Sequence, residues 1–386
     1  MLYILISLLI YPLLYLAALT RRRKVPRAVL IIQTAKIGDM VCSTAVFRAL
    51  RQRFPEARIA VLADPGACGI LESNPCVDEI IPVTARELKG LGGKLRVADR
   101  LRSEGFNISV TLMPNVANTI VPFWALIPRR LTVGPDSAGL TFRLASLFHT
   151  TVAWHHRNRS VATTYAELLE KGLSIPADAE SERLEVAVTG DAMEKSGNLL
   201  QKAGVVVDVK EGEKKDLLIG MAPAARNKLK EVSPKLYAEV ADKLIRDLSA
   251  RVVLIGGRGD HVAVGHVVHE MKCEAIDMSG RFTLSELPSL LARMDLFISV
   301  DSGPVYMAVA MGVPTVNMAG PCAMEERPLG DKNIVIQKDL PCSPCSYTFK
   351  TATTCHTGDR ECVTNLTSGP VIAAAKKLLE DRARGR

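Results

Sequence analysis

From Ala28 onward, short apolar runs alternate with longer stretches in which apolar residues recur at helical spacing. Runs of this length predict buried strands of a parallel sheet, and the stretches between them predict the helices that connect such strands. In the first half, strands are expected over Ala28–Gln33, Arg58–Asp64, Glu79–Val83 and Ile108–Met113. In the second half, they are expected over Leu217–Ala222, Arg251–Gly256, Asp295–Val300 and Pro314–Met318. The pattern therefore predicts an α/β protein with two doubly wound, Rossmann-like domains.

A polar segment rich in lysine and glutamate, from about residue 190 to 215, separates the two series of strands. A chain of 386 residues also has the length of about two domains. We expect an N-terminal domain over 28–195 and a C-terminal domain over 215–386, the latter with a cysteine-rich loop at 339–367 and a terminal helix. Because ligands of such sheets bind at the carboxyl ends of the strands, the cleft between the domains is the expected site.

Residues 1–19 carry no charge and consist mostly of Leu, Ile, Tyr and Ala, which is about the length that a bilayer core requires. A basic cluster follows at once: Arg21, Arg22, Arg23, Lys24 and Arg27. Positive charge after the apolar stretch keeps the rest of the chain in the cytoplasm and is not typical of a cleaved signal peptide. We therefore expect residues 1–20 to form a membrane-anchor helix. A buried or interfacial helix is the alternative, because Pro12 interrupts the segment.

The formal net charge of +8 favours anionic partners without choosing among phospholipid, phosphorylated sugar and nucleic acid. A cytoplasmic location would keep the nine cysteines as thiols or metal ligands rather than disulfides. Charge and composition thus indicate an anionic partner, and the motifs must show which kind of anion it is.

The first strand leads into the turn 34–40, where Gly38 permits a tight bend and Asp39 opens a helix. Asp39 has two interpretations. Its carboxylate either caps free amides of the helix or lies at the mouth of the strand, where it can accept a proton from an incoming hydroxyl.

Three turns of the second half have the chemistry of a diphosphate site. Asp301, Ser302 and Gly303 follow a strand and open a helix, whose free amides and dipole attract phosphate. Lys230 precedes another helix and is either a counter-charge for a leaving diphosphate or a solvated lysine. In a third turn, Gly257 permits close approach of a ligand, and Asp260 either binds a ribose hydroxyl or caps the next helix.

Together these segments resemble glycosyltransferase family 9, the heptosyltransferase family of lipopolysaccharide core assembly. The resemblance extends from about Ala28 to Ala375. It is carried by residues 36–40, 230–239, 253–257, 301–304 and 308–315.

The resemblance implies a GT-B fold, an ADP-heptose type of donor, and inversion at the anomeric carbon without a metal. The expected anchor would hold the enzyme at the cytoplasmic face of the inner membrane, where its lipid-linked saccharide acceptor is. The resemblance also implies that Asp39 is the catalytic base and that Lys230 and residues 301–303 hold the donor phosphates. The absence of Asp-x-Asp from the chain agrees with a leaving group stabilised by lysine and helix amides. The chain departs from many relatives at Val232, Ser302, Pro304 and Met307, which bears on donor identity more than on fold.

Four of the cysteines, Cys342, Cys345, Cys355 and Cys362, lie close together near the end of the chain. Four thiols at this density favour one structural zinc ion, with free thiols or two disulfides as the alternatives. The other five resemble ordinary core residues. No cofactor is expected for catalysis.

Basic side chains of the first half, the expected acceptor side, either bind acceptor phosphates or are solvated loop charges. Candidates for acceptor binding are Lys36, Arg129, Arg130 and Arg157. Nucleic acid is not an expected partner. Other functions left open are a silent transferase-like module at the membrane and a family member using another nucleotide sugar. An NAD-dependent enzyme ranks last, because the first strand lacks the G-x-G-x-x-G turn.

Overall fold

The computed structural model describes residues 2–23, 25–178, 180–207 and 215–385. The chain forms two compact units, one of residues 1–183 with 325–328 and one of residues 184–324 with 329–386. Their boundary precedes the expected connecting segment at 190–215, which begins with helix α9 of the second unit. Lys24 of the basic cluster and residues 208–214 of that segment lie outside the described residues.

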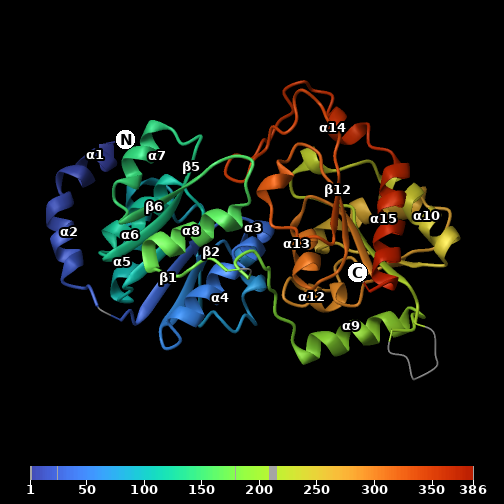
Figure 1. Ribbon diagram of the computed structural model, residues 1–386, viewed down its shortest axis with the longest axis horizontal. Coiled ribbons are helices and arrows are strands. Elements are labelled where there is room, and N and C mark those ends of the chain that lie inside the picture. The colour runs from blue at the N-terminus through green and yellow to red at the C-terminus, as the bar shows by residue number, and fades with distance from the viewer. Residues whose placement is uncertain (1, 24, 179, 208–214, 386) are drawn as a thin grey trace. The chain divides into compact units, whose positions relative to one another are not determined.

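The first unit is built on a six-stranded parallel sheet with the order β3-β2-β1-β4-β5-β6. Strand β1 is buried along its whole length, as its continuous apolar run predicts. Helices lie over both faces of this sheet (Figure 1). Its strands are β1 (Ala28–Gln33), β2 (Arg58–Ala63), β3 (Glu79–Pro82), β4 (Ile108–Thr111), β5 (Arg129–Pro135) and β6 (Thr151–His155). Its helices are α1 (Leu2–Leu9), α2 (Tyr11–Leu19), α3 (Ile37–Cys42), α4 (Thr44–Arg53), η1 (Pro65–Ile70), α5 (Gly90–Ser103), α6 (Val116–Trp124), α7 (Leu140–Ser146) and α8 (Val161–Leu173).

The second unit repeats this plan, with a six-stranded parallel sheet ordered β12-β11-β10-β7-β8-β9. Counted within the unit, the strand order is again 3-2-1-4-5-6, that of a Rossmann sheet. Its strands are β7 (Leu218–Ala222), β8 (Arg251–Leu254), β9 (Ile276–Asp277), β10 (Leu296–Val300), β11 (Thr315–Met318) and β12 (Asn333–Ile336). Its helices are α9 (Gly190–Lys202), η2 (Lys228–Lys230), α10 (Pro234–Leu248), η3 (Arg258–Asp260), α11 (His261–Glu270), α12 (Leu287–Leu291), α13 (Gly303–Ala310), α14 (Glu361–Thr364) and α15 (Ser368–Ala383), and η4 (Met324–Glu326) lies where the chain passes between units.

The expected α/β class with two doubly wound sheets is confirmed, and all eight expected strands are present within one to two residues at each end. Strands β5, β6, β9 and β12 were not expected. Two arginines begin β5, and His155 ends β6. Strand β9 spans only two residues and β12 only four, of which the first is Asn333. None of these strands therefore has the long apolar run of a central strand.

The N-terminal segment differs from the expected single anchor helix. It forms two short helices, α1 and α2, separated at Ile10. Pro12 lies in the first turn of α2, a place where its missing N–H costs nothing, and so marks a helix start rather than a helix interior. Across the part of the chain that the structure describes, helices both long enough and apolar enough to cross a membrane are absent.

One face of this helix pair is part of the core of the first unit. Ile4 is fully buried and belongs to the cluster that includes Phe123 and Phe148. The Trp124 indole N–H donates to Ser7 Oγ at 2.8 Å, and the ring of Tyr11 stacks on Phe123 at 5.4 Å. The segment is therefore packed as an integral part of the unit.

Replacing a buried residue of α1 should therefore destabilise the protein. We expect Ile4→Ala to lower the free energy of unfolding by about 2–5 kcal/mol, since a core methyl cluster is lost and a cavity remains. Leu9→Ala is the matched control, because Leu9 is 83% exposed, and it should change stability by less than about 0.5 kcal/mol. Urea denaturation of both variants measures the difference, and equal effects would contradict the observed packing.

Candidate active site

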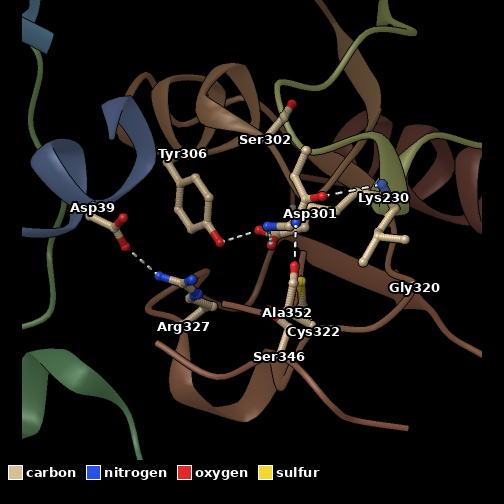
Figure 2. Close-up of polar contacts among 12 residues, drawn as sticks. Asp39, Lys230, Asp301, Ser302, Tyr306, Gly320, Cys322, Arg327, Ser346 and Ala352 are labelled. Atoms are coloured by element: carbon tan, nitrogen blue, oxygen red, sulfur yellow. Dashed lines mark hydrogen bonds and ion pairs between the residues drawn. The ribbon is translucent and has the colours of Figure 1, made fainter. Parts of the chain in front are cut away.

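Asp39 lies in the first turn of α3, directly after the carboxyl end of β1. Its backbone carbonyl accepts hydrogen bonds from Ser43 Oγ at 2.8 Å and from Gln33 Nε2 at 3.3 Å. The N-cap position of α3 is taken by Lys36. The carboxylate instead accepts a hydrogen bond from Arg327 Nη1 at 2.8 Å and remains 26% exposed (Figure 2). The observed partner of Asp39 is thus a cation, not a helix amide.

Arg327 is 288 residues from Asp39 in sequence and reaches it because residues 325–328 belong to the first unit. The preceding residue, Glu326, is almost completely buried, and its Oε2 lies 3.8 Å from His155 Nε2. His155 Nδ1 in turn pairs with Thr164 Oγ1 at 2.8 Å. These contacts fix the segment that presents Arg327. Sequence reasoning missed Arg327, because nothing near it in sequence indicates an acidic partner.

In the second unit, Lys230 and Asp301 follow β7 and β10, which are adjacent parallel strands. Adjacent parallel strands end at the same edge of a sheet, and this pair flanks the point where the strand order reverses. Lys230 Nζ lies 2.5 Å from Asp301 Oδ2 (Figure 2). The two side chains are 15% and 2% exposed, respectively. The structure therefore brings together two residues that the sequence assigned to the phosphate site.

Tyr306 of α13 completes this group. Its hydroxyl donates to Asp301 Oδ1, so both carboxylate oxygens of Asp301 have partners (Figure 2). A carboxylate held on both sides cannot rotate freely, and it fixes the ammonium group of Lys230 in turn. Tyr306 was not expected from the sequence, since a tyrosine in an apolar helix is read as a core residue.

The start of α13 lies directly after Asp301. Ser302 occupies the N-cap position, and its hydroxyl pairs with Ser299 Oγ at 3.2 Å. Gly303 is the first residue of the helix. The first-turn amides of an eight-residue helix and a lysine at the same sheet edge are the groups that bind phosphate in many α/β proteins.

Asp260 stands at the N-cap position of α11, but its side chain makes no cap hydrogen bond to that helix, so the capping alternative is wrong. Its Oδ2 accepts the backbone N–H of Gly257 at 2.8 Å and closes the turn between β8 and α11. A side chain at Gly256 would place its Cβ 2.9 Å from the Cβ of Asp260, so glycine is needed for this turn. Gly257 and Asp260 thus shape a loop at the carboxyl end of β8.

The expectation that Arg130 binds an acceptor is wrong in this structure. Arg130 is fully buried, and its guanidinium donates to the carbonyls of Phe148 and Ile127 and stacks over the Phe123 ring at 5.3 Å. Burial lowers the pKa of Arg130 to about 10. The side chain is a core residue that satisfies backbone carbonyls, which a guanidinium does well because it has five donors.

The other basic candidates remain at the surface. Arg129 is exposed at the start of β5, at the amino edge of the sheet, whereas Asp39 lies past the carboxyl end of β1. Arg157 is 42% exposed, with its Nε 3.8 Å from Asp136 Oδ2. Lys36 stands three residues before Asp39, in the same turn. Of the four, Lys36 is nearest to Asp39 along the chain.

The four clustered cysteines are all thiols and line one hollow of the second unit. Burial first, and then the negative charge of the neighbouring thiolates of Cys345, Cys355 and Cys342, raise the pKa of Cys362. The four sulfurs therefore lie near one another. In the described parts of the chain, however, no group of three or more His, Cys, Asp or Glu side chains is arranged to hold a metal ion.

Comparison with known proteins identifies the family that this geometry fits. The sequence profile of glycosyltransferase family 9 (heptosyltransferase) matches residues 94–356. The lipopolysaccharide heptosyltransferase 2 of Salmonella typhimurium is 26% identical over 328 residues, which are 80% of this chain and 87% of that protein.

Two solved structures share the fold over 92% of this chain. A family 9 glycosyltransferase from Veillonella parvula has a TM-score of 0.72 at 23% identity, and 98% of its chain is covered. The E. coli ADP-heptose lipopolysaccharide heptosyltransferase II has a TM-score of 0.70 at 21% identity, with 99% of its chain covered. At these identities the likeness concerns the fold.

Proposed function

The chain belongs to glycosyltransferase family 9, and on that premise we propose that it transfers a heptose from an ADP-activated donor to a lipid-linked acceptor of the lipopolysaccharide core. Relatives named as lipopolysaccharide heptosyltransferases support this substrate class. The observation that carries the proposal is the group formed by Lys230, Asp301 and Tyr306 at the start of α13.

This group has the chemistry of a diphosphate site. The ammonium of Lys230 supplies positive charge where the helix start supplies amides, so a departing ADP would meet both at the carboxyl edge of the sheet. Asp301 binds Lys230 rather than phosphate, because a carboxylate repels an anionic ligand. We therefore assign Lys230, Ser302 and Gly303 to the donor phosphates and give Asp301 and Tyr306 the role of positioning Lys230.

We assign the role of catalytic base to Asp39. In a single in-line displacement its carboxylate takes the proton of the acceptor hydroxyl, and the hydroxyl oxygen forms a bond to the anomeric carbon. The bond from that carbon to the phosphate oxygen breaks, and its electron pair leaves with ADP. Attack opposite to the leaving group inverts the anomeric configuration. Arg327 is the positioning residue, since it orients the Asp39 carboxylate at 2.8 Å.

Removing the carboxylate of Asp39 should slow sugar transfer strongly while the donor still binds. We expect Asp39→Asn to lower kcat at least ~10²-fold while ADP affinity stays within a few-fold. Arg327→Ala should also lower kcat, and Arg327→Lys should restore part of it, because a cation near the carboxylate returns. Steady-state assays with ADP-heptose measure both. An Asp39→Asn enzyme with normal turnover would remove Asp39 from the role, and an inert Arg327→Ala would leave Arg327 as a structural contact.

Donor binding should depend on Lys230. We expect Lys230→Ala to weaken ADP binding about 10-fold or more, since a charge-assisted contact to phosphate contributes about 1.5–3 kcal/mol. Lys228→Ala is the matched control, because Lys228 lies in the same turn but is 72% exposed and pairs with Glu231. Calorimetry measures both affinities. Equal affinities in the two variants would make Lys230 an ordinary structural lysine.

We further propose that Cys342, Cys345, Cys355 and Cys362 hold a structural metal ion, with zinc as the expected ion. Burial, and then the negative charge of the neighbouring sulfurs, raise the pKa of Cys362, and a cation among the four sulfurs would lower it again. Four thiolates close a tetrahedral shell and leave no position for a reacting water, so the ion would order the loop and take no part in transfer.

Loss of one thiol should therefore affect stability more than catalysis. We expect protein purified without chelator to contain about one zinc per chain. Cys345→Ser should lower both the zinc content and Tm, with kcat of the folded protein within a few-fold of normal. Cys273→Ser, outside the group, should change neither. Metal analysis and thermal melting test this, and metal-free protein with an unchanged Tm in Cys345→Ser would refute the site.

A further inference from the structure

Helices α1 and α2 present an apolar face to solvent opposite the face that packs on the first unit. Its members are exposed by 49% to 83% and recur at helical spacing, and we call them the N-terminal apolar face: Leu5, Ile6, Leu9, Leu13 and Leu16. The buried residues Ile4, Ser7 and Ala18 alternate with them along the same two helices. An exposed apolar stripe of this length on a folded unit marks a contact surface.

Helix α7, which shares a core cluster with α1, also has exposed leucines. Phe148 follows α7, and its ring lies 6.1 Å from that of Tyr11 of α2. Ala145 of α7 belongs to the same core cluster as Ile4 of α1. Two further exposed leucines, Leu140 at 65% and Leu147 at 58%, stand two helical turns apart at the two ends of α7. Exposed apolar residues therefore gather in this part of the first unit.

Positive charge accompanies the N-terminal apolar face. Acidic residues are absent from the sequence before Asp39, and Arg22 and Arg23 are exposed directly after α2. Arg53 and Arg129 are exposed as well, and we call Arg22, Arg23, Arg53 and Arg129 the arginine group. Burial first, and then the positive charges of Arg22 and Arg53, lower the pKa of Arg129, as is expected of neighbouring guanidinium groups. Like charges so close together favour a bound anion. Arginines after α2 could simply stabilise the negative end of the helix dipole. That role does not explain why Arg129 and Arg53 lie near them.

We propose that the α1–α2 pair is an in-plane membrane anchor whose N-terminal apolar face enters the acyl boundary of a bilayer while the arginine group binds anionic lipid phosphates. An apolar stripe flanked by basic residues and lacking acidic ones is complementary to an anionic lipid surface. An anionic bilayer presents phosphates over its whole surface, so it can meet all of these arginines at once, and we therefore favour it over a protein partner.

The contacts of α1 and α2 with the rest of the first unit determine how the two helices can lie relative to a bilayer. Ser7 accepts the indole N–H of Trp124, and Arg21 donates to the carbonyl of Arg102 at 3.1 Å, so both ends of the pair are attached to the unit. Insertion across a bilayer would break these contacts and expose Trp124 and Phe123. Binding parallel to the surface keeps them all. This orientation is independent of which sugar the enzyme transfers.

Vesicle binding by the full-length protein tests the proposal. Sedimentation with vesicles of phosphatidylethanolamine and phosphatidylglycerol should capture the protein, and vesicles of phosphatidylcholine alone should capture less. The double variant Leu9→Glu/Leu13→Glu should bind at least about 10-fold more weakly, because two charges enter the apolar boundary. Val262→Glu is the matched control, since Val262 is 69% exposed on α11 of the second unit, and it should bind normally.

The arginine group and the depth of insertion have separate readouts. Arg22→Gln/Arg23→Gln should abolish the preference for anionic vesicles. A tryptophan in the variant Leu13→Trp should be quenched more by lipids with a quencher near the headgroup than by lipids with one near the acyl end. Unchanged melting curves establish that the variants are folded.

Three outcomes would overturn the proposal. They are normal vesicle binding by the double glutamate variant, stronger quenching from the acyl end, and failure of the parent protein to bind either vesicle. In the last case, self-association that the glutamates abolish would identify a second copy of the chain as the occupant of this face.

Discussion

The donor group depends on one constraint of parallel sheets, namely that all strands end at the same edge. Strands β7 and β10 are neighbours, so the residues that follow them meet although Lys230 and Asp301 are 71 positions apart in sequence. These strands also flank the reversal of strand order, where the two adjoining loops diverge and leave room for a ligand. The end of β10 also fixes the position of Ser302, the N-cap residue of α13.

A buried ion pair is costly to desolvate, and its stability alone does not explain its presence. Asp301 is 2% exposed, and it is tolerable there because Lys230 and Tyr306 satisfy its two oxygens. Removing one partner of such a pair costs about 3–5 kcal/mol, whereas an apolar replacement of the whole group is often harmless. Apolar side chains could therefore replace Lys230, Asp301 and Tyr306 without loss of stability. The presence of the ion pair is best explained by a need to hold the Lys230 ammonium in place, where it is 15% exposed.

Local sequence pattern was sufficient for the central strands and for the turns that bear Asp39, Lys230 and Asp301, because each follows a continuous apolar run. It was not sufficient for contacts that the fold creates at long range. Arg327 meets Asp39 across 288 residues, and no periodicity reports such a pair. The adjacent Arg129 and Arg130 look alike in sequence, yet Arg129 stands at the exposed start of β5 and Arg130 begins the buried run that follows.

The same limit applies to the N-terminal segment, where hydropathy summed over nineteen residues suggested a span. Such a sum treats every apolar residue alike, whereas Ile4 is buried within the protein and Leu9 is 83% exposed. Only the contacts of Trp124 with Ser7 and of Tyr11 with Phe123 reveal that one side of the segment already has a partner. The exposed side is a single stripe, which matches the depth that an interfacial helix reaches rather than the thickness of a bilayer. The helices that bear this stripe are also packed into the core of the first unit. If the stripe binds a membrane, the first unit is therefore attached rigidly to the membrane surface and not through a flexible tether.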